Sequence, residues 1–164
     1  MRILGIDPGY GITGFGLVEA QRGQFQLLRC GSITTPAGMD FSARLELIYE
    51  DMRKLLEMAK PDVEAFEELF FGQNVTTGIG VAQSRGVILL AIRQAGLPVF
   101  QYKPMQVKQA VVGYGTATKH QVQDMTTRLL GLSAMPKPDD AADAIAIALC
   151  HARSHTSLLA QAGK

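Results

Sequence analysis

Residues 1–19 read MRILGIDPGYGITGFGLVE, and the pattern of this stretch decides the fold. The apolar run of residues 2–7 stops at Asp-Pro-Gly, which predicts a buried strand that ends in a turn. Residues 12–19 have the pattern of a second strand, and residues 25–34 that of a third. Because only short turns join these segments, we predict that they form an antiparallel meander.

Within this stretch, Gly9, Gly11 and Gly14 match the G-x-G-x-x-G pattern of dinucleotide-binding loops. In such a loop the glycines lead into a helix whose N-terminus faces the pyrophosphate. Here the following segment, GFGLVEA, has the pattern of a strand. We therefore interpret the motif as a glycine-rich hairpin, and this disfavours a nucleotide-dependent phosphotransferase.

The rest of the chain predicts two more strands and five helices. The predicted strands are residues 63–66 and 99–101, and the predicted helices are residues 41–59, 75–95, 104–112, 119–130 and 139–152. This order predicts an α/β domain, with a five-stranded mixed sheet whose first three strands are antiparallel and whose faces are flanked by helices. We assign residues 1–152 to one domain and residues 153–164 to a polar C-terminal tail.

The composition is that of a globular protein rather than a disordered one. The chain has 164 residues, of which 47 % are hydrophobic and 19 % are charged. Cys30 and Cys150 belong to no CxxC pair, so we expect free thiols in the core and a reducing, cytoplasmic location. No apolar run is long enough to span a bilayer or to serve as a signal peptide, so we expect no membrane association.

The net charge of +1 hides an uneven distribution. Residues 1–71 carry 7 Lys/Arg and 11 Asp/Glu, a net −4, whereas residues 72–164 carry 9 Lys/Arg and 4 Asp, a net +5. Three of those four aspartates, Asp139, Asp140 and Asp143, lie within five residues. A basic surface around an acidic cluster suits a polyanion that meets a divalent metal, although charge alone fits an ordinary solvated surface better.

Asp7 ends the first predicted strand. An acid at the C-terminal end of a central strand lies where open α/β sheets bind ligands. An aspartate before Pro-Gly also caps many turns. The residue pattern alone leaves these two interpretations level.

Two further groups of acids are candidates for a shared site. Glu67 and Glu68 point to opposite sides of an extended chain, so only one of them should reach it. On the last helix, Asp143 shares a face with Asp140 at i,i+3 and with Asp139 at i,i+4. Asp139 also suits an N-cap, and Asp140 a first-turn charge near the helix dipole. Spacing alone therefore leaves both choices open.

Such an acid set fits the hydrolysis of phosphodiesters. That reaction must activate a water and stabilise charge on the attacking and leaving oxygens, which two Mg²⁺ or Mn²⁺ ions roughly 3.5–4 Å apart can do. These hard cations take oxygen ligands, so several carboxylates must converge from distant parts of the chain. The acids at the two strand ends and on the last helix meet that requirement.

The whole pattern resembles the RuvC family of Holliday junction resolvases, within the RNase H-like superfamily. The matching stretches follow the family's order over most of the chain and are ILGIDPGYGITGFG, RLELIYEDM, AFEELFFGQN, AQSRGVILLA, YKPMQVKQAVVGYGTATKHQVQ and DDAADAIAIALCHA. The resemblance implies a metal-dependent endonuclease that resolves four-way DNA junctions by two symmetric nicks, in recombination and repair. The alternative is a non-catalytic junction-binding module on the same fold, which would have no need of mutually repelling acids.

The resemblance also selects among the acids. It assigns catalysis and metal binding to Asp7, Glu67, Asp140 and Asp143, with Asp7 shared between two Mg²⁺ or Mn²⁺ ions. Asp139 and Glu68 then become neighbours of the site rather than members. Some relatives carry His at the position of Asp140, so this site is expected to be more anionic than theirs.

Four residues are expected to contact DNA. The family places an aromatic residue at Phe70, where it can stack on or wedge against an unpaired base. Arg85 either contacts DNA or supports the fold. Lys108 and Lys119 match basic family positions, although each alone would pass for a surface lysine. Residues 118 and 121 predict a T-x-x-Q capping box, which puts Lys119 on the first turn of a helix, a natural phosphate site.

Two symmetric nicks call for two active sites, so we expect a homodimer with twofold symmetry. Gly78, Ala82 and Gly86 form a stripe of small residues on one predicted helix, which suits close approach of a second helix or of the chain's own sheet. The resemblance further implies a partner motor complex of the RuvA/RuvB type for junction binding and branch migration. His151 and His155, at i,i+4, are predicted to be solvated surface histidines rather than metal ligands.

Overall fold

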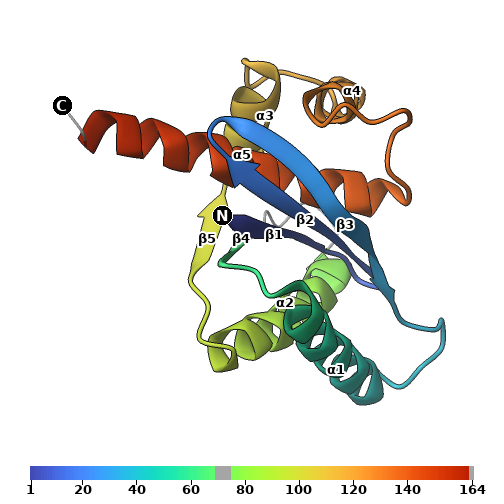
Figure 1. Ribbon diagram of the computed structural model, residues 1–164. Coiled ribbons are helices and arrows are strands. Elements are labelled where there is room, and N and C mark those ends of the chain that lie inside the picture. The colour runs from blue at the N-terminus through green and yellow to red at the C-terminus, as the bar shows by residue number, and fades with distance from the viewer. Residues whose placement is uncertain (69–74, 163–164) are drawn as a thin grey trace.

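The structure, a computed structural model, describes residues 1–68 and 75–162, with side chains for residues 1–68 and 78–155 (Figure 1). Its strands are β1 (Arg2–Pro8), β2 (Ile12–Gln21), β3 (Gln24–Thr34), β4 (Val63–Glu67) and β5 (Val99–Tyr102). Its helices are α1 (Phe41–Ala59), α2 (Val75–Gln94), α3 (Pro104–Val112), α4 (Lys119–Leu129) and α5 (Asp139–Ala162). Every predicted element is present, and all boundaries but one lie within two residues of the prediction.

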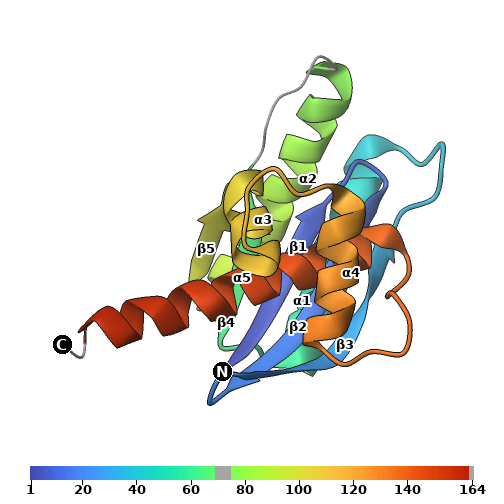
Figure 2. The ribbon, with the colours of Figure 1, turned by 90° about the horizontal axis from the view of Figure 1, so that it is seen from above.

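The exception is the end of α5. The sequence predicted a helix over residues 139–152, and the helix continues to Ala162. No proline or glycine interrupts the segment before Gly163, so nothing in the backbone chemistry ends the helix earlier. Figures 1 and 2 show that the C-terminal part of α5 projects beyond the edge of the sheet.

The five strands form one mixed sheet in the order β3-β2-β1-β4-β5. The first three strands are antiparallel to one another, whereas β4 lies parallel to β1 and β5 lies parallel to β4. The predicted meander and the predicted mixed sheet are therefore confirmed. Since β1 is central, its side chains are covered on both faces.

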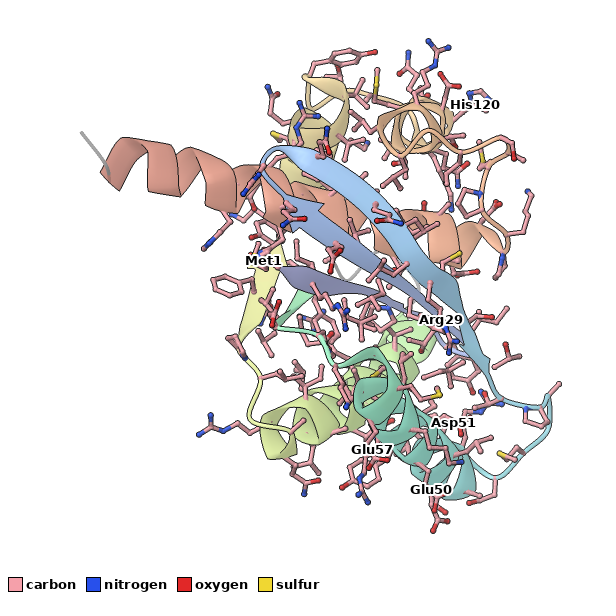
Figure 3. The ribbon with its side chains drawn as sticks, in the orientation of Figure 1. Met1, Arg29, Glu50, Asp51, Glu57 and His120 are labelled. Carbon is pink, nitrogen blue, oxygen red and sulfur yellow. The ribbon has the colours of Figure 1, made fainter. Side chains whose placement is uncertain are left out.

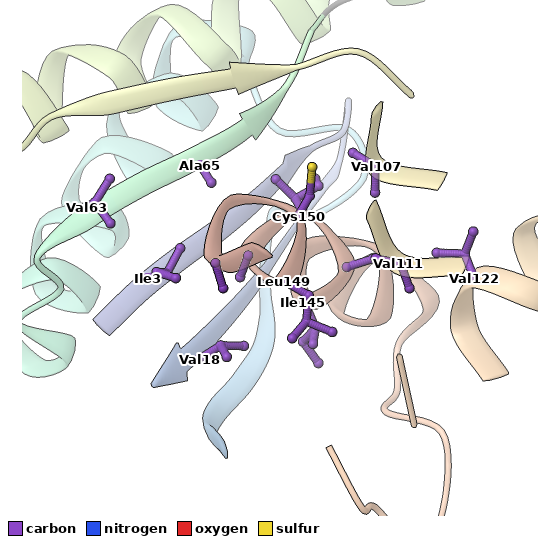
Figure 4. Packing of buried hydrophobic residues seen from close by; sticks show 14 of the residues in the cluster. Ile3, Val18, Val63, Ala65, Val107, Val111, Val122, Ile145, Leu149 and Cys150 are labelled. Carbon is purple, nitrogen blue, oxygen red and sulfur yellow. The ribbon is translucent and has the colours of Figure 1, made fainter. Parts of the chain in front are cut away.

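Helices cover the two faces of the sheet separately, with α1 and α2 on one face and α3, α4 and α5 on the other (Figure 1). On the α1/α2 face the core includes Leu4, Ile6 and Phe66, all fully buried. On the other face, Ile145 and Leu149 of α5 lie between the sheet and the helices α3 and α4 (Figure 4). The polar side of α1 points away from the sheet, as its acidic residues show (Figure 3).

The glycine-rich motif forms the predicted β1–β2 hairpin, paired from Arg2↔Glu19 to Pro8↔Thr13. Two glycines in it also allow α5 to rest directly on the sheet backbone. A Cβ at Gly5 would lie 2.9 Å from the backbone nitrogen of Ala148 and would collide with the Ala144 carbonyl. A Cβ at Gly14 would lie 2.8 Å from the Cβ of Asp140. These contacts fix the height and the register of α5 over β1 and β2.

Both cysteines are free thiols, as predicted, with Cys150 buried and Cys30 half-buried against the same core. In the ranges that the structure describes, no helix combines the length and the apolar character needed to cross a membrane.

Candidate active site

Asp7 and Glu67 lie side by side at the ends of two neighbouring parallel strands. The register of β1 and β4 pairs Ile6 with Phe66, so Asp7 and Glu67 follow at the same level. Side chains alternate between the two faces along a strand. Asp7 therefore lies on the same face as Ile3, and Glu67 on the same face as Val63, which is the face that α5 covers. Because β4 neighbours β1 in the sheet, Glu67 reaches the same edge as Asp7.

The helix α5 brings two more acids to this point. Gly14 pairs with Asp7 in the β1–β2 ladder, and the Asp140 backbone lies directly on Gly14. Asp140 therefore begins α5 next to Asp7. One turn later Asp143 shares that helix face, and it is half-buried, with 27 % of its side chain exposed. The structure thus brings together the four acids that the sequence singled out.

The negative charges of the other three acids act on the pKa of Asp7. The pKa of the Asp7 carboxyl is raised to about 7. Burial is the largest cause, followed by the negative charges of Asp143, Glu67 and Asp140. A carboxyl whose pKa is raised in this way lies where a compensating cation would be most stabilising. The positive charge of Lys119 already opposes the shift in part.

A cavity of about 230 Å³ opens over this acid cluster. It is lined by Asp7, Glu67 and Asp143, by two lysines and by apolar side chains of α3, α4 and α5. Lys108 comes from α3 and Lys119 from the first turn of α4. Burial and the charge of Asp143 raise the pKa of Glu67, and both lysines oppose that rise. The cavity therefore combines buried acids with a cationic wall.

The predicted capping box at the start of α4 is confirmed. The Thr118 side chain accepts a hydrogen bond from the Gln121 backbone, and the Gln121 side chain accepts one from the Thr118 N–H. The box fixes the direction of the first turn, from which the Lys119 ammonium lies 2.6 Å from Oδ2 of Asp143. Lys119 thus sits at the positive end of a helix dipole and inside the acidic site.

The donor set suits a hard divalent metal, because it consists of carboxylate oxygens in a partly buried cavity. As the side chains lie, no three His, Cys, Asp or Glu residues of the described chain are grouped closely enough to hold an ion. One of these carboxylates, that of Asp143, is paired with Lys119. The acids could hold a metal after small side-chain rotations, with Asp7 at the centre of the set.

Two acids that spacing alone could not exclude lie elsewhere. Asp139 is 55 % exposed and pairs with Lys137 at 3.2 Å. Glu68 follows Glu67 on the opposite side of the extended chain, and its charge acts on Arg85 rather than on Asp7. Neither residue lines the cavity.

Arg85 is buried, with 6 % of its surface exposed. Its guanidinium donates to the Glu67 carbonyl at 2.6 Å and to the Gln101 side chain at 2.8 Å. It also lies over the ring of Phe66, 5.1 Å from the centroid. Of the two roles predicted from the sequence, this favours support of the fold over contact with DNA. Nothing in the sequence pattern indicated Gln101 as its partner.

The prediction for His151 was wrong. It is 2 % exposed, its Nδ1 is hydrogen-bonded to the Tyr102 hydroxyl at 2.7 Å, and its ring packs against Phe100. Burial, with a contribution from the charge of His155, lowers the pKa of His151 to about 4. The helical spacing placed this histidine correctly on one face of α5, but only the packing on β5 decides that this face is covered.

Phe70 lies outside the described residues.

Comparisons with known proteins identify the family of this chain. The family model described as crossover junction endodeoxyribonuclease RuvC matches residues 3–151. The curated crossover junction endodeoxyribonuclease RuvC of Chloroflexus aurantiacus (strain ATCC 29366 / DSM 635 / J-10-fl) is 54 % identical over 158 residues, which cover 96 % of each chain.

Two solved structures are similar over nearly their whole length. The RuvC structure of Thermus thermophilus is 36 % identical, with a TM-score of 0.89 and 96 % of each chain covered. The T. thermophilus RuvC in complex with Holliday junction substrate is 34 % identical, with a TM-score of 0.88 and the same coverage. From the match along the sequence and the match of the fold, the chain belongs to the RuvC family of crossover junction endodeoxyribonucleases.

Proposed function

We propose that this chain resolves four-way DNA junctions by metal-dependent hydrolysis of a phosphodiester in each of two opposed strands. The observation that carries the proposal is one cavity lined by acids from β1, β4 and α5 and by two lysines, in which burial and neighbouring acids raise the pKa of Asp7 to about 7. An enzyme would hold such mutually repelling acids in order to bind cations. A non-catalytic binding module has no use for them.

The four acids divide the work of holding metal. Asp7, at the centre of the set, is the carboxylate that two ions would share, and Glu67, Asp140 and Asp143 complete the ligands. Two bound Mg²⁺ or Mn²⁺ ions supply an activated water and stabilise charge on the attacking and leaving oxygens. The members of this family are metal-dependent nucleases, and the number and identity of the ions are our inference.

The lysines hold the DNA. Lys119, on the first turn of α4, and Lys108, on α3, flank the cavity and present cations to a phosphate that enters it. Lys119, which pairs with Asp143 in this structure, would be free to contact that phosphate if a metal were held by Asp143. We further propose that Phe70 stacks at the junction crossover, as the family resemblance implies.

We infer a homodimer that uses the outer face of α2. Ile79 and Leu90 are 53 % and 51 % exposed on this helix, and a Cβ at Gly86 would meet nothing within 4 Å. An open, apolar helix face with a small residue at its centre suits a second copy of the same helix. Two copies would carry the two active sites that symmetric nicks need. A motor complex of the RuvA/RuvB type is the partner that the family resemblance suggests.

The test of the activity is cleavage of an end-labelled four-way junction by the purified chain, with Mg²⁺, with Mn²⁺ and with chelator. We expect symmetric nicks that require metal, and little cleavage of linear duplex. The variant D7N should abolish nicking while it keeps junction affinity, because the lysine wall is intact. D139N is the matched control, since Asp139 lies outside the cavity, and it should cut at the wild-type rate. Nicking that persists in chelator, or equal cutting of duplex, would contradict the proposal.

The test of the dimer is sedimentation at micromolar concentration, with and without junction DNA. L90E should shift the chain toward monomer and lose paired nicks, whereas M58E should not. Met58 is the matched control because it is 63 % exposed on α1, on a different surface. Wild-type protein that stays monomeric even with DNA would refute the symmetric model.

A further inference from the structure

The backbone carbonyl of Glu67 lacks a partner in the sheet. The N–H groups of Glu64 and Glu68 donate toward β5, to the carbonyls of Pro98 and Tyr102. Along a strand these directions alternate, so the carbonyl of Glu67 points toward β1. The register would pair it with the backbone nitrogen of Pro8, and proline has no N–H.

Arg85 supplies the missing donor. It reaches the strand end from α2, on the face of the sheet opposite to the acid cluster. Its guanidinium donates a hydrogen bond of 2.6 Å to the Glu67 carbonyl and one of 2.8 Å to the side chain of Gln101 on β5. The guanidinium also lies over the Phe66 ring, with its carbon 5.1 Å from the centroid, which adds a cation–π contact. One rigid group thus joins the last residue of β4 to α2 and to β5.

The contact lies at the point where Glu67 leaves the sheet. Beyond Phe66 the β1–β4 pairing ends, so β1 no longer holds the Glu67 carbonyl, and only the pairing with Tyr102 of β5 keeps Glu67 in the sheet. We propose that Arg85 is a positioning residue for Glu67: its guanidinium clamps the Glu67 carbonyl, so that the Glu67 carboxylate faces Asp7 in the cavity. The inference rests on the proposed function, because it treats Glu67 as a metal ligand.

The clamp acts through position rather than through charge. The carboxylate of Glu68, which lies outside the cavity, is the charge that acts on the pKa of Arg85. The pKa of Glu67 responds instead to the charges of Asp143, Lys108 and Lys119. A substitution that keeps the positive charge but loses the two-pronged geometry should therefore damage the site. Lysine at position 85 is that substitution, since a single ammonium cannot reproduce a planar fork.

The experiment compares wild type, R85K and R93K. Arg93 is the matched control because it lies on the same helix and is exposed. Binding of Mn²⁺ to the DNA-free protein is followed by the electron paramagnetic resonance of free Mn²⁺, and junction affinity and the metal dependence of nicking are measured alongside. We expect R85K to weaken Mn²⁺ binding about tenfold, as loss of a group that orients a ligand does. The Mn²⁺ concentration for half-maximal nicking should rise in parallel, with junction affinity unchanged, and R93K should match wild type.

A role in stability alone would give a different result. R85K would then lower the unfolding temperature and the active fraction, but the remaining folded protein would bind Mn²⁺ as wild type does, which would overturn the inference. If R85K does not fold, Q101L removes one acceptor of the clamp and should weaken Mn²⁺ binding by a smaller factor; unchanged binding would again overturn it. Wild-type protein that binds Mn²⁺ but does not nick junctions would refute the proposed function instead, since the Mn²⁺ affinity of the variants needs no cleavage.

Discussion

The ammonium of Lys119 lies 2.6 Å from Oδ2 of Asp143, so a cation from α4 pairs with an acid from α5 inside the candidate metal site. This hydrogen bond raises the pKa of Lys119, and the charges of Asp143, Asp139 and Asp7 add to the rise. The lysine therefore neutralises part of the acid cluster in the protein without metal. A divalent ion held by Asp143 would compete with this lysine.

The substitution K119Q should have opposite effects on metal binding and on catalysis. Without the competing ammonium, the protein should bind Mn²⁺ several-fold more tightly in the absence of DNA, because the acid cluster loses a nearby positive charge. Junction cleavage should nevertheless slow by about 100-fold, since the phosphate contact that we propose for Lys119 would be lost. Calorimetric Mn²⁺ titration and single-turnover nicking measure the two effects.

The control for K119Q is K137Q, which removes an ion pair of 3.2 Å with Asp139 at the exposed start of α5. It should leave both measurements unchanged. Weaker Mn²⁺ binding by K119Q would show that the lysine organises the ligands rather than competing with the ion.

Asp7 should make stability depend on pH in the protein without metal. Its folded-state pKa is raised to about 7, so the folded state holds a proton that the unfolded chain has already released. Stability from this group should therefore be highest below the unfolded pKa of about 4 and fall as pH rises toward 7. D7N removes the charge and should stabilise the protein at pH 8 by about 2 kcal/mol, or roughly 5 °C in unfolding temperature.

Thermal unfolding of wild type and D7N in chelator, from pH 4 to pH 8, measures this effect. The difference in unfolding temperature between the two proteins should grow as the pH rises and should nearly vanish at pH 4. A difference of constant size across the range would mean that the asparagine acts through packing rather than through the lost charge.

Gly14 should be essential for the geometry of the site. A methyl group there would collide with the backbone of Asp140 and push the start of α5 away from β2. We expect G14A to lower stability by about 2 kcal/mol or more and to reduce nicking far beyond what the folded fraction explains, because Asp140 and Asp143 move away from Asp7.

Gly11 provides the control for G14A, as it lies in the same hairpin and a Cβ there meets nothing within 4 Å. G11A should keep both stability and activity. Equal behaviour of the two variants would mean that the glycines serve the turn alone and not the docking of α5.

Glu64 should be a source of instability. It is fully buried on the α1/α2 face of β4, and within the described part of the chain neither carboxylate oxygen has a hydrogen-bond partner. Burial raises its pKa well above the ordinary value. A leucine of similar volume, in E64L, should therefore stabilise the protein by about 2 kcal/mol at pH 8. The gain should shrink as pH falls toward the ordinary glutamate pKa, because the unfolded chain then also holds the proton and folding no longer has to bind one.

Chemical denaturation at pH 5 and pH 8 measures the change, and E50L is the matched control on the exposed side of α1 (Figure 3). That control should change stability by less than about 0.5 kcal/mol. If E64L destabilised the protein at both pH values, Glu64 would have to be satisfied by a group that leucine removes.

The local pattern of the chain was enough to predict where its strands and helices lie. The apolar run before Asp-Pro-Gly, the alternation of β2 and the helical spacing of α1 are properties of neighbouring residues, and the structure reproduces their boundaries. The capping box at Thr118 is local in the same sense. The C-terminal extension of α5 was not predicted, because the polar residues of this segment are typical of a frayed tail, although no helix breaker interrupts them.

The tertiary structure decided which side chains meet. Strand alternation separates Glu67 from Glu68, but which of them faces the site depends on the face that α5 covers. Likewise, helical spacing allowed either Asp139 or Asp140, and the contact of α5 with Gly14 puts Asp140 beside Asp7. Residues far apart in sequence also determine the burial of His151 and the clamp of Arg85. Sequence periodicity therefore fixed the elements and their candidate faces, whereas only packing, through register and close approach, determined which faces are joined.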